Sequence, residues 1–153
     1  GFPKDSPSNL AWLPEKATKG LDAFRLTIDI EEKSRPPKMC VTFQGDGLRD
    51  GLSGWTLILK PRGDKVQATI ERYDRLVYQS DPVKYEGDDK KPTTLELLYY
   101  GKRLTVRLGT QVLFDQNAIR AIPKMTRIGI ATWGPQVRIT AIELRAPART
   151  RTR

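Results

Sequence analysis

Apolar and polar residues alternate one by one over most of the chain. The segment DAFRLTIDIEE places Phe24, Leu26, Ile28 and Ile30 on one face and polar side chains on the other. Alternation with a period of two is typical of a β-strand that has one buried face. The same pattern recurs in residues 39–44, 55–60, 66–71, 75–79, 95–99, 104–108, 112–114, 128–130 and 137–144. We therefore expect about ten short strands.

The last of these segments, VRITAIELR, shifts its inward positions by one residue. Val137 and Ile139 point inward at its start, and Ile142 and Leu144 point inward at its end. Such a change of parity predicts a β-bulge near Ala141. No segment of ten or more residues shows the 3.6-residue period of a helix. The pattern therefore predicts an all-β, antiparallel sandwich of two sheets.

Turn residues and composition divide the chain further. KPRGDK, residues 60–65, predicts a hairpin between two strands, and DPVKYEGDDKKP, residues 81–92, predicts a polar loop. We expect an extended lead-in over residues 1–20, the sandwich over 21–146 and a flexible basic tail over 147–153.

Two residue types limit the chemistry. Histidine is absent, which excludes Ser-His-Asp and Cys-His nucleophile systems, imidazole acid–base catalysis and His-ligated metals. Cys40 is the single cysteine, so no intramolecular disulfide can form. An enzyme built from this chain would have to use carboxylates, Lys, Tyr or a metal held by oxygen ligands.

The net charge of +9 is unevenly placed along the sequence. Residues 1–100 hold 16 Lys and Arg against 16 Asp and Glu, whereas residues 101–153 hold 11 against 2. Part of this excess lies in the strand KRLTVR and part in the tail RAPARTRTR. A basic end of this kind is either a solubilising tail or a salt-dependent binder of nucleic acid or another anionic polymer.

The order of the motifs resembles a known superfamily. TTLELLYYGKRLTVRLGTQVLFDQ, followed by RIGIATWGPQVRITAIELR, resembles the C-terminal half of concanavalin A-like jelly-roll domains. FRLTIDIEE, CVTFQ and GWTLILKPRGDKVQATIER lie where the early strands of those domains would be. Over residues 20–146 the chain looks closest to laminin-G-like modules and to 3-keto-disaccharide hydrolase-like domains of bacterial envelope proteins. RLGTQV replaces the Asn-Gly turn of the laminin-G-like hairpin. The resemblance implies extracellular or periplasmic work on carbohydrates.

A catalytic reading of the resemblance rests on carboxylates. Retaining glucanases of the superfamily use an EIDIEF-type strand, and TIDIEE offers Asp29 and Glu31 about 7 Å apart on one strand face. Thr27 stands where the nucleophile would be. Glu71 is the third candidate catalytic carboxylate. The alternative is that these are ordinary polar positions on a solvent-facing strand.

Two loop motifs have both a functional and a structural interpretation. GDGLRDG, with Asp46 and Asp50, could offer oxygen ligands to Ca²⁺, but a Gly/Asp turn explains the same residues. The acidic residues of YEGDDKKP, which are Glu86, Asp88 and Asp89, have the same two interpretations: Ca²⁺ ligands or a turn. Arg-Gly-Asp at residues 62–64 could be a recognition tip, and its Gly and Asp are also typical of a hairpin turn.

The predicted ligand site is a polar and aromatic sheet face. In YYGKRLTVRLGTQVLFD, Val112 and Phe114 are expected in the core with the apolar residues of LTVRL. The residues expected to line the face are Tyr73, Tyr78, Tyr100, Arg103 and Arg107, with Trp133 in a loop at its rim and Trp55 in the core. We expect a non-catalytic module that binds a glycan or envelope polymer. The alternatives are a glycoside hydrolase and a polyanion-binding basic region.

Overall fold

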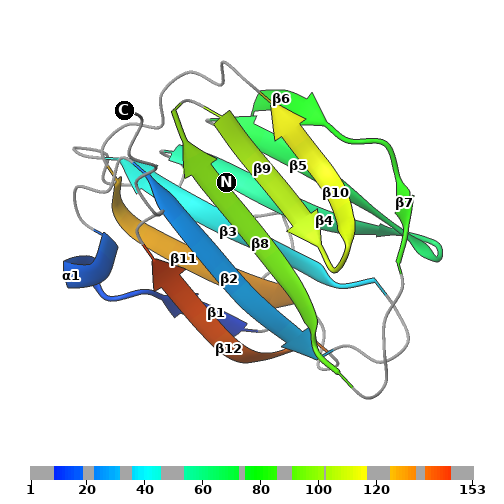
Figure 1. Cartoon of the computed structure of the whole chain (residues 1–153), viewed down its shortest axis with the longest axis horizontal. Helices are drawn as coiled ribbons and strands as arrows, with labels where there is room; N and C mark the ends of the chain where they lie inside the picture. The colour runs from blue at the N-terminus through cyan, green and yellow to red at the C-terminus, as the bar shows by residue number, and fades with distance from the viewer. Residues whose placement is uncertain are drawn as a thin grey trace, which may run out of the picture.

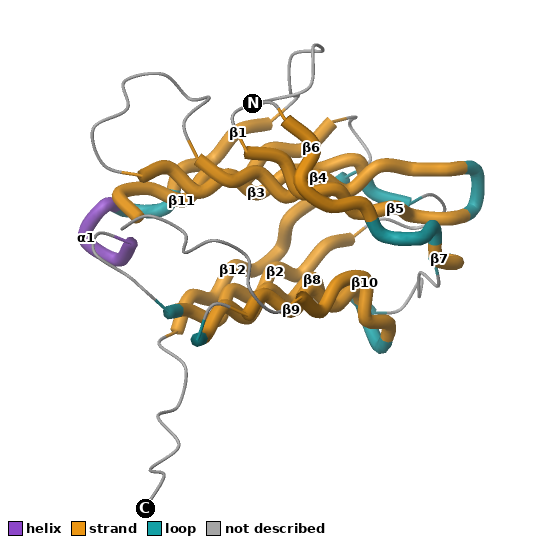
Figure 2. Tube along the Cα trace, turned by 90° about the horizontal axis from the view of Figure 1, so that it is seen from above, coloured by secondary structure: helices purple, strands orange, loops and turns teal. Residues whose placement is uncertain are grey.

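Two antiparallel sheets form the molecule, as the alternation predicted. The computed structural model describes residues 9–18, 23–31, 36–45, 54–72, 75–85, 91–101, 103–116, 125–133 and 137–145. Figure 1 shows one sheet in front of the other, and Figure 2 shows them as two separate layers. No helix among these residues is long and apolar enough to cross a membrane.

The five-stranded sheet has the order β10-β9-β8-β2-β12, and all neighbours are antiparallel. Its strands are β10 (Gln111–Gln116), β9 (Arg103–Leu108), β8 (Thr93–Tyr100), β2 (Phe24–Glu31) and β12 (Arg138–Arg145).

The seven-stranded sheet has the order β1-β11-β3-β4-β5-β6, and β7 also pairs with β5. Its strands are β1 (Asn9–Trp12), β11 (Met125–Trp133), β3 (Lys38–Gly45), β4 (Gly54–Arg62), β5 (Lys65–Arg72), β6 (Arg75–Gln79) and β7 (Val83–Lys84). One helical turn, α1 (Glu15–Thr18), follows β1. Because β1 pairs with β11, residues 9–12 of the expected lead-in belong to the sandwich. The tail at 147–153 lies outside the described residues.

The inner faces of both sheets form the core. Phe24 on β2 packs on Phe43 on β3 with ring centroids 5.3 Å apart, and Tyr78 on β6 meets the edge of Phe114 on β10 at 4.4 Å. Trp55 is buried in the same cluster, as predicted. Aromatic contacts between the layers therefore join the sheets at several points.

The β4–β5 hairpin and the bulge in β12 confirm two local predictions. Gly63 and Asp64 form the hairpin turn, where Gly63 has a φ of 66°, a conformation that favours glycine. The β12 register shifts between Ile139 and Ala141. Ile142 then pairs with Ile28 on the core side, but it remains 36% exposed because β12 is an edge strand.

A second bulge makes the prediction for Val112 wrong. The β9–β10 register shifts between Val112 and Phe114, so Leu113 and Phe114 are both buried. Val112 pairs with Arg107 and is 48% exposed on the outer face. Val112, Leu113 and Phe114 are all apolar, so the alternation here shows no change of parity that would reveal the extra residue.

Candidate functional site

Tyr100, Arg103 and Arg107 share the outer face of the five-stranded sheet, as predicted. Tyr100 pairs with Arg103 in register and is 52% exposed. The Arg103 guanidinium donates two hydrogen bonds of 2.6 Å to the Asp115 carboxylate, and Thr105 donates a third at 3.3 Å. The hydrogen bond that Arg103 donates, together with its positive charge, lowers the pKa of Asp115. The same hydrogen bond, together with the negative charge of Asp115, raises the pKa of Arg103. Arg103 is therefore already bound to a carboxylate.

The charges of this sheet balance. Its strands carry five arginines and five carboxylates. Arg25 forms a salt bridge with Glu96 at 2.7 Å, and Arg145 forms one with Glu143. The positive charges of Arg103 and Arg107 in the strand KRLTVR are therefore offset by carboxylates on the other strands of this sheet. These residues are Arg25, Arg103, Arg107, Arg138 and Arg145, and Asp29, Glu31, Glu96, Asp115 and Glu143.

The predicted aromatic members of the face lie on the other sheet or outside the described residues. Trp133 ends β11 and is only 7% exposed, packed with Cys40, Ile58 and Ala131. Tyr78 turns inward onto the core because β6 is bulged beside it. Tyr73 lies outside the described residues, between β5 and β6 of the seven-stranded sheet. The single face proposed from the sequence is therefore not assembled.

The candidate catalytic carboxylates also lie apart. Asp29 and Glu31 are on the outer face of β2, where Asp29 Oδ1 accepts a hydrogen bond of 2.8 Å from Thr94 Oγ1. Glu71 is on β5 of the seven-stranded sheet. Acid–base partners must flank one bond, so these three groups do not form a glycosidase pair across one cleft.

The metal candidates cannot be placed. Asp46 and Asp50 lie outside the described residues, as do the acidic residues at 86–89. Within the described residues, no three His, Cys, Asp or Glu side chains gather in a way that could hold a metal ion.

The strands of the seven-stranded sheet, by contrast, are strongly basic. Its strands hold eight Lys or Arg residues and a single acid, Glu71. Its outer face combines polar residues with a small apolar cluster of Cys40, Ile58, Ala131 and Trp133, and several of these residues are buried. Among them, Cys40 is 1% exposed, and burial raises the pKa of its thiol to about 12. The eight cations are Lys38, Lys60, Arg62, Lys65, Arg72, Arg75, Lys84 and Arg127.

Trp12 lies across this outer face above Gly129. A Cβ atom at position 129 would come within 2.8 Å of the Trp12 ring and 3.0 Å of Thr42. The Arg127 guanidinium sits 5.0 Å from the centroid of the same ring, a cation–π distance. The absence of a side chain at Gly129 is therefore what allows the indole to lie against the sheet.

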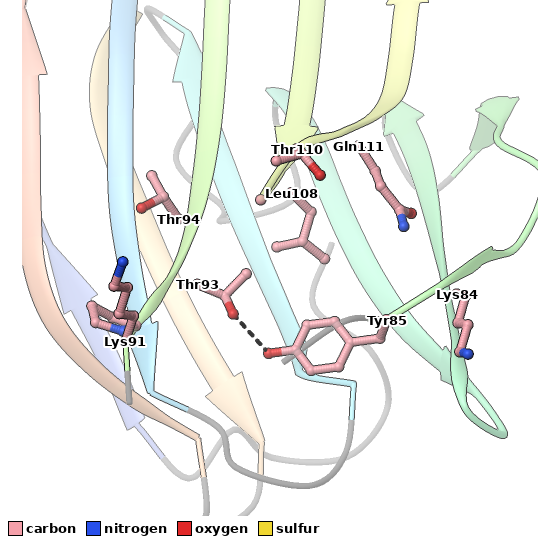
Figure 3. A pocket seen from close by; sticks show the side chains of 10 residues that line it. Lys84, Tyr85, Lys91, Thr93, Thr94, Leu108, Thr110 and Gln111 are labelled. Atoms are coloured by element: carbon pink, nitrogen blue, oxygen red, sulfur yellow. Dashed lines mark hydrogen bonds between the residues drawn. The ribbon is translucent and has the colours of Figure 1, made fainter. Parts of the chain in front are cut away.

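A pocket of about 420 Å³ opens at one end of the sandwich. It is formed by the end of β7, the start of β8 and the β9–β10 turn (Figure 3). Tyr85 extends toward β8, and its hydroxyl donates a hydrogen bond of 3.4 Å to Thr93 Oγ1. The lining residues are Lys84, Tyr85, Lys91, Pro92, Thr93, Thr94, Leu108, Gly109, Thr110 and Gln111.

Backbone hydrogen bonds hold the pocket walls. The Gly109 N–H donates to the Thr94 carbonyl at 2.9 Å, and Gly109 has a φ of 60°. The Tyr85 N–H donates to the Asp64 carbonyl at 3.1 Å, which ties the aromatic residue to the β4–β5 turn. The site thus combines one aromatic ring with hydroxyl, amide and ammonium groups at fixed positions. Sequence reasoning missed it because residues 81–92 were expected to be a polar loop, although Tyr85 was a possible signal.

No protein-family model matches the chain, and no curated protein matches it. Solved structures do. Caenorhabditis elegans galectin LEC-6 superposes with a TM-score of 0.60 at 13% identity, covering 95% of this chain and 94% of that one. The fold is an antiparallel two-sheet jelly roll.

Two further structures agree on that fold. Sheep galectin-11, in complex with glycerol, has a TM-score of 0.55 at 12% identity and covers 94% of this chain and 99% of its own. The carbohydrate-binding module CBM66 from Bacillus subtilis has a TM-score of 0.58 at 16% identity, covering 82% and 76% respectively. The predicted concanavalin A-like, antiparallel jelly roll is confirmed as a fold, and identities this low show the fold alone.

Proposed function

We propose that the chain is a non-catalytic carbohydrate-binding module whose sugar site is the Tyr85 pocket. The observation that carries the proposal is a polar pocket built around one aromatic ring on a fold shared by galectins and a carbohydrate-binding module. Its volume lies in the range of small-ligand pockets, roughly 300–1,000 Å³. The ring offers an apolar face to a sugar, and the surrounding groups can hydrogen-bond its hydroxyls.

The enzyme alternative finds less support in this arrangement. Asp29, Glu31 and Glu71 are distributed over two sheets, and the described lining of the pocket contains no carboxylate. A glycosidase needs paired carboxylates at the bond it cleaves. Binding without hydrolysis is therefore the function we favour.

The finer assignments extend the proposal. We propose a module of the laminin-G-like or 3-keto-disaccharide hydrolase-like kind, placed extracellularly or in the periplasm, on the resemblance of residues 20–146. Tyr100 and Arg107 stay a predicted second contact surface, and Ca²⁺ at Asp46 and Asp50 stays a prediction.

A glycan array followed by calorimetry tests the pocket. Tyr85→Ala should weaken the best neutral glycan at least tenfold, about 1.4 kcal/mol, because the ring is lost. Gln111→Ala, at a half-buried polar position, should weaken the same glycan while leaving the core intact. A Tyr100→Ala/Arg107→Ala variant is the matched control on the outer face of the five-stranded sheet.

Two results would contradict the proposal. Unchanged affinity in both pocket variants, with loss in the control, would move the site to the outer face of the five-stranded sheet. Hydrolysis of a bound oligosaccharide would restore the enzyme alternative.

A further inference from the structure

Three cations stand side by side at the end of the seven-stranded sheet. Arg62 on β4 pairs in register with Lys65 on β5, and Lys65 pairs with Lys84 on β7. Neighbouring strands lie about 4.8 Å apart, so the row spans roughly 10 Å. All three residues are exposed, and alternation puts them on the outer face, because Val66 next to Lys65 is in the core.

This row is unfavourable within the protein alone. Like charges directly opposite each other on neighbouring strands repel. In the described part of the chain, no carboxylate forms a salt bridge with Lys65 or Lys84. An edge strand often carries a lysine that prevents pairing with other chains, which explains Lys84 on β7. It does not explain Lys65, which lies between β4 and β7.

Buried polar groups hold one member of the row in place. The side chain of Gln67, only 8% exposed, accepts a hydrogen bond of 3.1 Å from Arg62 Nε. Gln67 Nε2 in turn donates to the Ser80 carbonyl at 2.9 Å. Within the described part of the chain, the terminal N–H groups of Arg62 have no acceptor, and a planar guanidinium matches a carboxylate or sulfate.

The same strand face carries a buried polar atom without a partner. Thr69 lies two residues beyond Gln67 on β5 and is 4% exposed, and its Oγ1 has no hydrogen-bond partner in the described structure. Buried hydroxyls normally have hydrogen-bond partners. The Thr69 hydroxyl is therefore a donor and acceptor on this face that forms no hydrogen bond within the described structure.

The row adjoins the Tyr85 pocket. Lys84 belongs to both, and the Tyr85 N–H bonds to the Asp64 carbonyl in the turn between Arg62 and Lys65. We infer that Arg62, Lys65 and Lys84 form a subsite for the carboxylate or sulfate group of an acidic glycan whose sugar ring lies in the Tyr85 pocket. This inference rests on the proposed function and names its ligand class.

Binding to three polysaccharides and one DNA duplex tests the subsite. Dextran sulfate and polygalacturonate carry the two anionic groups, and dextran is the uncharged probe. The duplex is a polyanion whose charges are phosphates, with no carboxylate or sulfate. In 150 mM NaCl, Lys65→Gln/Lys84→Gln should weaken binding of at least one acidic polysaccharide about tenfold or more. Whichever of the two responds identifies sulfate or carboxylate as the preferred group.

The matched control removes two positive charges from the other sheet. Arg138→Gln/Arg145→Gln should change the same affinities less than about twofold, because both exposed residues lie on β12, at the opposite edge of the five-stranded sheet from β10. Equal losses in both variants would mean that only net charge matters, and would overturn the subsite. DNA binding that is as tight, and equally sensitive to Lys65 and Lys84, would also overturn it.

Failure of the subsite and failure of the proposed function give different results. If neutral glycans bind through Tyr85 and acidic probes bind no tighter, the subsite is wrong and the module remains a carbohydrate binder. If acidic probes bind through Lys65 and Lys84 while Tyr85→Ala changes nothing for any glycan, the pocket is wrong. The inferred site, which combines this pocket with the cationic subsite, is then overturned as well.

Discussion

The strands of the five-stranded sheet carry five arginines and five carboxylates, whereas those of the seven-stranded sheet carry eight cations and Glu71 alone. On the first sheet Arg103 is bound to Asp115 and Arg25 to Glu96. On the second, Lys65 faces cations on both sides. A polar face whose opposite charges balance, with several of them already paired, has less left for a ligand. The difference shows why counting polar residues on a strand does not locate a binding surface.

The two outer faces also differ in packing, and the largest expected effect tests this. Ile58 is 2% exposed although it points away from the core, so Ile58→Ala should lower the free energy of unfolding by about 2–5 kcal/mol. Val112→Ala on the other outer face, at 48% exposure, should cost less than about 0.5 kcal/mol. Urea denaturation measures both. Equal costs would contradict the packing described around Ile58.

A smaller effect is expected at Gly129. Gly129→Val should destabilise by about 1–3 kcal/mol, because its side chain meets the Trp12 ring and Thr42. Ala141→Val, at an exposed position on β12, is the control and should be nearly neutral. Adding Trp12→Ala to Gly129→Val should recover part of the loss. If the double variant is simply additive, the two residues do not collide.

Cys40, on β3 of the seven-stranded sheet, should make the stability of the protein fall as the pH rises through the alkaline range. Burial raises its pKa from 9.0 to about 12, so the unfolded thiol ionises first as the pH rises. Its contribution is therefore complete below pH 9 and is lost progressively toward pH 12. Between pH 9 and 10, the wild type should lose about 1 kcal/mol more than Cys40→Ala, measured by urea denaturation. Parallel curves for the two proteins would refute this.

The smallest effect concerns the paired charges of the five-stranded sheet. Arg103 lowers the pKa of Asp115, so this pair stabilises above the ordinary carboxyl pKa and the effect disappears as the pH falls through the lowered value. In Arg103→Gln, NMR titration of the Asp115 carboxyl should give a higher midpoint. Arg145→Gln should leave that midpoint unchanged, and a shift of similar size there would contradict the assignment.

Alternation alone was enough to predict every described strand except β1 and β7, and most of the core. Phe24, Leu26, Ile28 and Ile30 are all fully buried, and Trp55 joins them, because a half-buried strand leaves a period-two pattern. The hairpin turn at Gly63 and the bulge near Ala141 were also readable, since each leaves a local mark in the sequence.

The site was not readable, because it depends on which strands become neighbours. Tyr78 and Trp133 looked like partners of Arg103, yet they lie on the other sheet. Lys65 and Lys84 are 19 positions apart and meet only because the two-residue strand β7 pairs with β5. Sheet membership arises from long-range pairing, which side-chain periodicity does not encode.

One of the four register shifts in the described strands lies between the interior strands β11 and β3. The other three fall on strands that end the strand order of a sheet: β6, β10 and β12. Each interrupts the straight row of backbone donors and acceptors that a second chain would need for strand addition. Copies of this domain crowded together along a polymer, or joined in tandem, would find no regular edge at these three strands. The irregular borders therefore protect the sandwich against amyloid-like association.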